Sequence, residues 1–251
     1  MRIIWTVIFV LLQTLCIAQI TILPGNKSIN TSLLKTGTYR MAYTISYNGK
    51  WVPLGEYVID LSIENKQLKV NATLTFTKTT TRWTDNFVAD ATSFLPVSSY
   101  SDRSERTLSL SFANKLTGFY LDKKSQTKKQ IDQNLPGNCF DVSVYPYIVQ
   151  MLPLELGYRA ILPVFDYEAA DNSKIHRIEI TEVKTDIYTS DLTGEHKVWK
   201  VTVLEGNTGH LFNYFIDKTT RRIWKINIVS AKGDKITISL SLIHISQGIV
   251  R

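Results

Sequence analysis

The chain has 251 residues, of which 44% are hydrophobic and 20% are charged, and its formal net charge at pH 7 is +7. A disordered chain does not reach this hydrophobic fraction, and a collagen-like chain needs far more than 12 glycines and 7 prolines. The length suffices for one large β domain or two small ones, and either can bury a core. The composition therefore predicts a globular protein, but it identifies no function.

The first 18 residues have the layout of a secretory signal peptide. Arg2 supplies an early positive charge, residues 3–12 form an apolar run, and Cys16-Ile17-Ala18 form a small-residue exit. The apolar run is shorter than the roughly 20 residues that a membrane-spanning helix needs. We predict cleavage after Ala18, with an uncleaved anchor as the alternative. Cleavage would leave no membrane span and one cysteine, Cys139.

Strict alternation of apolar and polar residues dominates the rest of the chain. The apolar rows are Tyr39, Met41, Tyr43, Ile45 and Tyr47; Tyr57, Ile59, Leu61 and Ile63; and Leu68, Val70, Ala72, Leu74 and Phe76. Successive side chains of a strand point to opposite faces, so each row predicts a strand with one apolar face. Further strands are predicted at residues 80–90, 94–102, 105–113, 116–122, 157–167, 174–188, 196–205, 210–217, 221–231 and 234–245.

One segment departs from this alternation. Between residues 140 and 152, Val144, Ile148 and Met151 follow helical spacing, and Asp141 is placed to cap the start. We predict one short helix there, and a strand interrupted by prolines is the alternative. The basic stretch 123–138, which holds Lys123, Lys124, Lys128 and Lys129, is predicted to be a solvated loop.

The pattern predicts an all-β, mainly antiparallel fold in a single domain, residues 19–251. About a dozen strands with short connections form a meander, because parallel crossovers would need intervening helices. Strands that are apolar on one face must close into a barrel, form a sandwich or wrap around a helix. We expect a large curved sheet that forms a half-barrel or barrel with one short helix. A wide barrel leaves an apolar cavity, whereas a sandwich fills itself.

Candidates for contact with a ligand in such a cavity come from the apolar strand faces and from the helix. They are Tyr39, Met41, Tyr43, Phe76, Trp83, Phe87, Tyr145, Tyr147 and Ile148. The alternative for each aromatic residue is ordinary packing in the core.

Motifs that carry catalysis are not found in the sequence. The four histidines lack the spacing of a zinc site, and there is no Gly-x-Ser-x-Gly elbow or phosphate-binding glycine loop. The acidic group Asp166, Glu168 and Asp171 could hold a general acid and base or a calcium ion, but a solvated turn explains it better. We therefore predict no catalytic residue, no metal and no cofactor, and a protein that is not an enzyme.

The carboxy-terminal half resembles a known family. Residues 140–168, 212–228 and 233–240 carry the likeness, in which an aromatic–Ile–Asp turn precedes basic residues and Lys-Ile. Here these features are Tyr214, Phe215, Ile216 and Asp217, followed by Arg221, Arg222, Lys225 and Ile226. The chain resembles domain-of-unknown-function family 3108, whose members are exported bacterial β-proteins. The resemblance implies location in the periplasm or cell envelope of a bacterium.

That family is similar in architecture to the bacterial lipoprotein-sorting carriers, in which a curved sheet and a helical lid enclose a pocket for acyl chains. The leading hypothesis is therefore non-enzymatic binding of a lipid, an acyl chain or a lipoprotein in an apolar concavity. The alternative is a structural or interaction protein of the envelope that binds a protein or glycan partner. A hydrolase with an unrecognised site ranks third, and no nucleic-acid partner is expected for an exported chain.

Overall fold

The computed structural model describes residues 19–167, 174–191 and 193–244. The expected signal peptide, residues 1–18, lies outside this part of the chain. The first strands are β1 (Ile20–Thr21), β2 (Gly37–Tyr47), β3 (Lys50–Glu64), β4 (Gln67–Phe76), β5 (Arg82–Asp90), β6 (Pro96–Asp102), β7 (Arg106–Phe112), β8 (Leu116–Asp122) and β9 (Thr127–Gln133). The later strands are β10 (Phe140–Asp141), β11 (Ala160–Asp166), β12 (Lys174–Ser190), β13 (Gly194–Glu205), β14 (Leu211–Asp217), β15 (Ile223–Val229) and β16 (Lys235–His244). A 3-10 turn, η1 (Thr31–Leu33), and one α-helix, α1 (Tyr145–Met151), complete the described elements.

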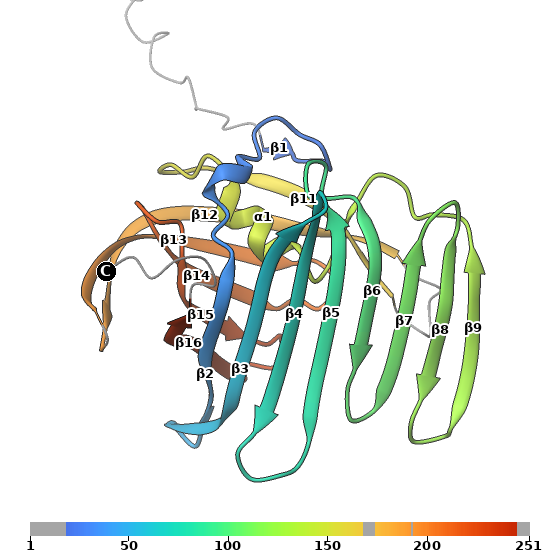
Figure 1. The fold of residues 1–251 in the computed structure, drawn as a ribbon. Coiled ribbons are helices and arrows are strands. Elements are labelled where there is room, and N and C mark those ends of the chain that lie inside the picture. Colours follow the sequence, from blue (N-terminus) through green and yellow to red (C-terminus); the bar gives the residue numbers. More distant parts are fainter. Residues whose placement is uncertain (1–18, 168–173, 192, 245–251) are drawn as a thin grey trace, which may run out of the picture.

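All these strands belong to one sheet. Its order is β1-β11-β12-β13-β14-β15-β16-β2-β3-β4-β5-β6-β7-β8-β9, and β10 pairs with β11 beside this path. The antiparallel pairing of β16 with β2 joins the two halves of the chain. Figure 1 shows β2–β9 as one wall and β12–β16 as another, with α1 between them. Within the described residues β1 and β9 do not pair, so the sheet is a half-barrel and not a closed barrel.

Register shifts bend the strands around the helix. One shift lies between Tyr43 and Thr44 where β2 pairs with β3, and another lies between Leu240 and Leu242 where β16 pairs with β2. A β-bulge inserts an extra residue on one strand, which bends the strand and increases its twist. These bulges therefore curve the sheet at the junction of its two walls.

The all-β fold with a curved, mainly antiparallel sheet and one short α-helix is confirmed. The exceptions are two short parallel pairings, β1 with β11 and β10 with β11. The predicted helix 140–152 is too long, because residues 140 and 141 form β10. The helix is capped at Val144 with no side-chain hydrogen bond, so the prediction that Asp141 caps it is wrong.

The prediction of a loop at 123–138 is also wrong, because residues 127–133 form β9. The sequence of this strand shows no alternation of apolar and polar residues, because only Ile131 is buried on it. Lys128 and Lys129 are exposed on β9, the last strand of the sheet order. Charged side chains on an edge strand oppose pairing with another chain.

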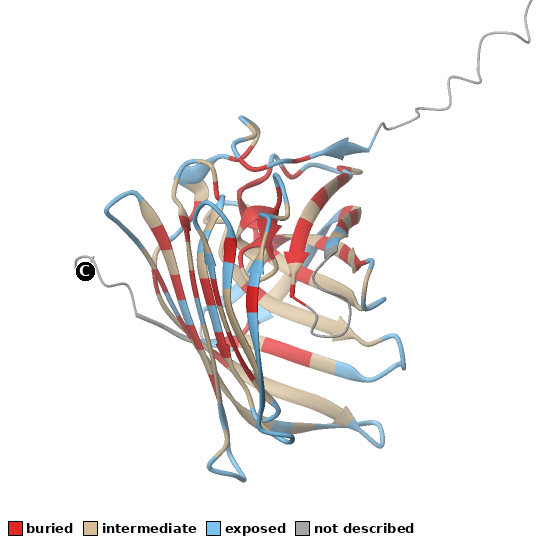
Figure 2. Ribbon diagram, turned by 90° about the vertical axis from the view of Figure 1, so that its right-hand side faces the viewer, coloured by how far each residue is buried: buried red, intermediate tan, exposed pale blue. Residues whose placement is uncertain are grey.

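The core lies between the two walls of the sheet and α1. Figure 2 shows the buried residues gathered along the middle of the strands and on the helix. Val144, Ile148 and Met151 are each 0% exposed and pack into this cluster. A smaller second cluster includes Leu108, Leu116, Ile131, Cys139 and Phe165. The helix therefore fills part of the space inside the curved sheet.

Candidate ligand-binding cavity

A cavity of about 420 Å³ remains between the concave face of the sheet and α1. Its volume lies within the range of roughly 300–1,000 Å³ that is usual for ligand pockets. One wall consists of the inward side chains of β2 to β5: Tyr39, Met41, Tyr43, Tyr57, Ile59, Leu61, Val70, Ala72, Leu74, Trp83, Asp85 and Phe87. Every second residue of these strands faces the cavity, as the period of a strand requires.

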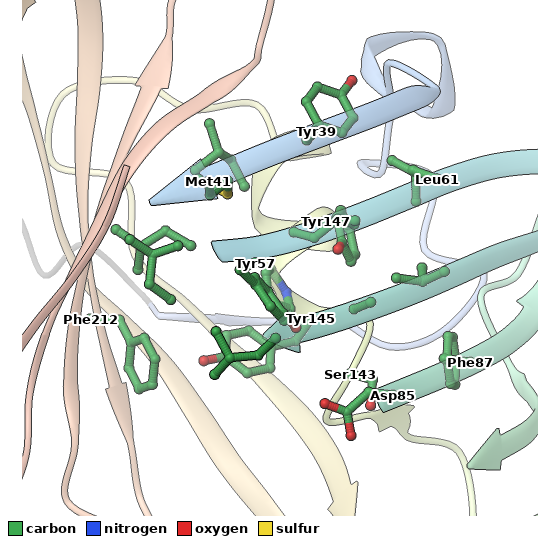
Figure 3. Close-up of a pocket in the computed structure, with 18 of the residues that line it drawn as sticks. Tyr39, Met41, Tyr57, Leu61, Asp85, Phe87, Ser143, Tyr145, Tyr147 and Phe212 are labelled. Carbon is green, nitrogen blue, oxygen red and sulfur yellow. The ribbon is translucent and has the colours of Figure 1, made fainter. Parts of the chain in front are cut away.

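Strand register aligns these inward residues into rows. Tyr39 pairs with Ile59, and Ile59 pairs with Ala72. A second row runs from Met41 through Tyr57 to Leu74. Figure 3 shows Tyr39, Met41, Tyr57, Leu61 and Phe87 arranged along neighbouring strands. Register therefore makes this wall a continuous, mainly apolar surface.

The opposite wall comes from α1 and the carboxy-terminal strands. Tyr145, Pro146, Tyr147 and Gln150 line it from the helix, and Phe212, Tyr214, Ile223, Ile226, Ile228 and Ile238 line it from the strands. Figure 3 shows Phe212 across the cavity from the strands that carry Tyr39 and Leu61. The cavity is thus lined by residues from both halves of the chain.

Seven of the nine predicted ligand contacts line the cavity: Tyr39, Met41, Tyr43, Trp83, Phe87, Tyr145 and Tyr147. Phe76 does not, and its ring packs edge-on against Tyr43 and Trp83 at centroid distances of 6.4 and 5.0 Å. Ile148 does not either, because it is fully buried on the face of α1 that packs into the core. Contact of any of these residues with a ligand stays a prediction.

A buried network of hydroxyl groups ties α1 to the wall. The Tyr145 hydroxyl donates to Glu205 Oε1 at 2.7 Å, and the Tyr214 hydroxyl donates to the Tyr145 oxygen at 3.1 Å. Thr208 donates to the other Glu205 oxygen at 2.9 Å. Burial, together with Tyr214 and Glu205, raises the pKa of Tyr145 well above its ordinary value. The phenol therefore stays neutral and keeps donating to Glu205.

A second polar group lies at the β5 side of the cavity. Arg103 Nη2 and Asp85 Oδ2 are 3.2 Å apart, and the Arg103 guanidinium lies 5.5 Å from the centre of the Trp83 ring. The sequence pattern did not predict Asp85, Arg103 or Glu205 as cavity residues. The position of Asp85 could have been predicted, because Asp85 lies between Trp83 and Phe87 on the inward face of β5.

The comparisons with known proteins agree with this fold. A family model described as protein of unknown function, DUF3108, matches residues 38–233. The chain belongs to the DUF3108 family. The resemblance inferred from the carboxy-terminal motifs is thereby confirmed. A search of curated proteins finds no match.

Among solved structures, this DUF3108 chain is similar to the β-barrel-like protein of DUF1849 from Brucella abortus. The TM-score is 0.55 and the sequence identity is 11%, and the match covers 85% of this chain and 99% of that one. An identity this low shows the fold alone.

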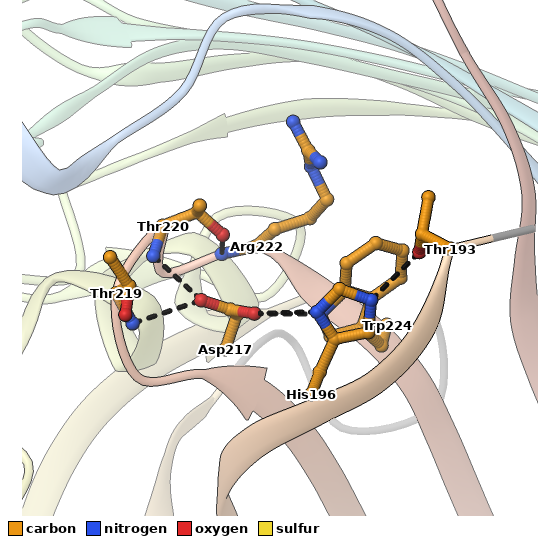
Figure 4. A network of polar contacts seen from close by, with 7 residues as sticks. All are labelled: Thr193, His196, Asp217, Thr219, Thr220, Arg222 and Trp224. Atoms are coloured by element: carbon orange, nitrogen blue, oxygen red, sulfur yellow. Dashed lines mark hydrogen bonds and ion pairs between the residues drawn. The ribbon is translucent and has the colours of Figure 1, made fainter. Parts of the chain in front are cut away.

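The family motif at the end of β14 has a structural role. Asp217 Oδ1 accepts the backbone N–H groups of Thr219 and Thr220, and its Oδ2 accepts the Trp224 indole N–H at 3.1 Å. His196 Nδ1 lies 3.3 Å from Asp217 Oδ2, and the imidazole stacks on Trp224 with 4.1 Å between ring centres (Figure 4). The motif therefore holds β13 against the β14–β15 turn of the DUF3108 fold.

Thr193 Oγ1 lies 2.7 Å from His196 Nε2, which completes a chain of hydroxyl, imidazole and carboxylate (Figure 4). This order occurs in nucleophilic triads, where the hydroxyl faces a bound substrate. Thr193 is exposed, and none of the three residues lines the cavity. The contacts of this group connect β13 to the β14–β15 turn.

The structure describes only one of the three acidic residues that the sequence groups together. Of the acidic group, Asp166 ends β11, whereas Glu168 and Asp171 lie outside the described residues. No cluster of three or more histidine, cysteine or acidic side chains suited to a metal occurs in the described part of the chain. Nor does any helix described there have the length and apolar character needed to cross a membrane.

Proposed function

We propose that this DUF3108 protein binds an acyl chain, as a lipid or as the lipid part of a lipoprotein, without chemical conversion. The observation that carries the proposal is the 420 Å³ cavity, whose walls are mainly aliphatic and aromatic side chains. An apolar cavity gains free energy from an apolar ligand without specific polar contacts. The proposal places the protein, after export, in the periplasm or cell envelope of a bacterium.

Burial of methylene groups sets the size of ligand that the cavity favours. Ten methylenes gain about 8 kcal/mol at roughly 0.8 kcal/mol each, before the cost of association is subtracted. A short chain would gain too little to offset that cost. The proposal therefore predicts selectivity for long acyl chains.

A cavity-filling variant tests the proposal. Ala72 is buried on the inward face of β4 between Ile59 and Asp85, so the Ala72→Leu side chain would occupy space inside the cavity. We expect this variant to bind 14-carbon acyl ligands at least tenfold more weakly than the unmodified protein. Isothermal titration calorimetry on detergent-free protein measures the difference, with myristic acid and monomyristoylglycerol as probes.

Asn71→Leu is the matched control, because Asn71 is exposed and adjoins Ala72 on the opposite face of the same strand. This variant should bind as the unmodified protein does. Absence of binding for both probes, or equal binding by the Ala72→Leu variant, would contradict the proposal.

Partner binding is a second candidate function, and one observation favours it. Tyr47 and Trp51, at the tip of the β2–β3 hairpin, are 66% and 54% exposed. Large aromatic side chains on a surface are typical of contacts with proteins or glycans. Replacing both with serine should leave acyl binding unchanged under the first proposal.

A further inference from the structure

The concave face of the sheet changes from apolar to polar along a single row of paired residues. Ala72 on β4 pairs with Asp85 on β5, and Asp85 pairs with Ser101 on β6. On the other side of Ala72 the row continues through Ile59 to Tyr39. The change therefore occurs at β5, on the border of the apolar cavity.

A small pocket of about 40 Å³, here called the polar annex, lies beyond this border. It shares Asp85, Arg103, Val142 and Ser143 with the larger cavity. Its other polar lining residues are Ser99, Ser101, Arg106, Asp141, Asp166 and Tyr167. A volume of this size holds on the order of three water-sized groups. Figure 3 shows Asp85 and Ser143 together at one end of the cavity, where the two spaces adjoin.

Three lining residues of the annex have donor atoms without a partner. Ser101 Oγ, Arg103 Nε and Arg106 Nη1 are buried and make no hydrogen bond to another protein group. A buried donor without an acceptor is costly, so such atoms mark places where an acceptor from outside the protein is bound. The arrangement suits a group with two or three acceptor oxygens.

The charged side chains around the annex limit the charge that a bound group can carry. The lining holds two guanidinium groups, those of Arg103 and Arg106, and three carboxyl groups, those of Asp85, Asp141 and Asp166. Burial raises the pKa of Asp141 to about 7, so this carboxyl group is partly protonated near neutral pH. The annex therefore has no excess positive charge, and a buried anionic group would lack compensation.

We propose that the polar annex holds the head group of the ligand, and that this head group is uncharged and rich in acceptor oxygens. The ester and hydroxyl oxygens of a monoacylglycerol have this chemistry. The acyl chain would lie in the apolar cavity, and the oxygens would accept from Ser101, Arg103 and Arg106. This inference rests on the proposed function and adds the class of head group to it.

Two ligands with the same chain test the head group separately from the chain. Titration calorimetry at pH 8 compares monomyristoylglycerol with myristic acid, whose carboxylate is charged at that pH. We expect the monoacylglycerol to bind at least tenfold more tightly. Equal affinities, or tighter binding of the acid, would overturn the head-group inference and leave the acyl-chain proposal standing.

The Arg106→Gln variant tests the annex itself. Loss of a hydrogen bond from a charged donor should weaken monomyristoylglycerol binding about tenfold and affect myristic acid less. The control is Arg82→Gln, because Arg82 is exposed on β5 and lines neither space. Equal effects of the two variants on both ligands would overturn the inference. The same comparison of the two ligands with Ser101→Ala is a second test of the annex, since this change removes one hydroxyl with almost no change in volume.

Discussion

Asp141 lies just before α1 with only 2% of its surface exposed. Its Oδ1 atom accepts the backbone N–H of Ser143 at 2.8 Å. Burial raises the pKa of this carboxyl group to about 7, and the nearby charges of Asp166 and Asp85 act in the same direction against the hydrogen bonds from Ser143. The folded protein therefore favours the protonated form of Asp141.

This environment predicts a pH dependence of stability. The unfolded chain releases this proton near pH 4 and the folded chain near pH 7, so the contribution of Asp141 to stability falls as the pH rises between these values. We predict that Asp141→Asn is more stable than the unmodified protein at pH 8, by a few kcal/mol at about 1.4 kcal/mol per pKa unit. The difference should vanish near pH 4, as measured by urea unfolding across this range.

Asp132→Asn is the control, because the side chain of Asp132 is 66% exposed in its ion pair with Lys115. The free energy of unfolding of this variant should equal that of the unmodified protein at every pH. An Asp141→Asn variant without a gain at pH 8 would show that the carboxyl group is ionised in the fold at little cost.

Residue periodicity predicts which side chains face the inside of the sheet, but it does not predict which of these side chains line a cavity. The alternation of β2 and β5 placed Tyr39, Met41, Tyr43 and Trp83 on the cavity wall. On the helix, the apolar spacing that includes Ile148 identified the residues that pack into the core. Gln150 is two positions further along, on another face of the helix, and lines the cavity. Arg103 and Glu205 escaped prediction because their contacts at the cavity are with partners distant in sequence, Asp85 and Tyr145.

At the scale of elements, Asp217 joins the β12–β13 hairpin to the turn after β14. It is 6% exposed, and burial alone would raise its pKa. Hydrogen bonds from Thr220, Trp224 and Thr219 outweigh that effect, so the pKa is lowered overall. The contribution of Asp217 to stability is therefore present above pH 4 and is lost as the pH falls through the folded-state pKa.

Removing the Asp217 carboxylate should weaken the contact between the β12–β13 hairpin and the turn after β14. Asp217→Ala leaves the N–H groups of Thr219, Thr220 and Trp224 without their acceptor. The bond from Trp224 is buried and the other two are partly buried, and an unpaired buried donor costs about 1–3 kcal/mol. We predict a loss of about 3 kcal/mol in the free energy of unfolding at pH 7, measured by urea titration.

Asp234→Ala provides the comparison, since Asp234 is an exposed aspartate of another turn, bonded to Ser230. That change should cost no more than about 0.5 kcal/mol, as surface substitutions usually do. Similar losses for the two variants would contradict the role assigned to Asp217.

The longer strands were predicted well, and the shortest and the most charged ones were not. Strands β2 to β8 matched the predicted ranges to within a few residues, apart from an earlier start for β3. The signal is clearest on β4, which buries Leu68, Val70, Ala72 and Leu74 on one face. Strand β9 was predicted as a loop, since its backbone pairing with β8 is not reflected in its exposed, charged side chains. The two-residue strands β1 and β10 are too short to produce a period.

For the whole molecule, the sequence predicts a curved sheet but not how its two halves join. The pairing of β16 with β2 connects residues 191 to 206 positions apart, from Ile236 with Ile45 to His244 with Thr38. Local patterns carry no information on such pairings. That junction brings Ile238 of β16 and Met41 of β2 to the same cavity. The cavity is thus a property of the assembled sheet, although most of its lining could be predicted strand by strand.

The most direct test of acyl-chain binding is native mass spectrometry of the protein purified from bacterial envelopes without detergent, followed by lipid extraction. We predict a bound species near one-to-one stoichiometry that contains an acyl chain and an uncharged, ester-linked head group. The Ala72→Leu variant should carry much less of it, and Asn71→Leu should carry as much as the unmodified protein. A mass without any bound acyl species, with the unmodified protein folded, would contradict acyl-chain binding.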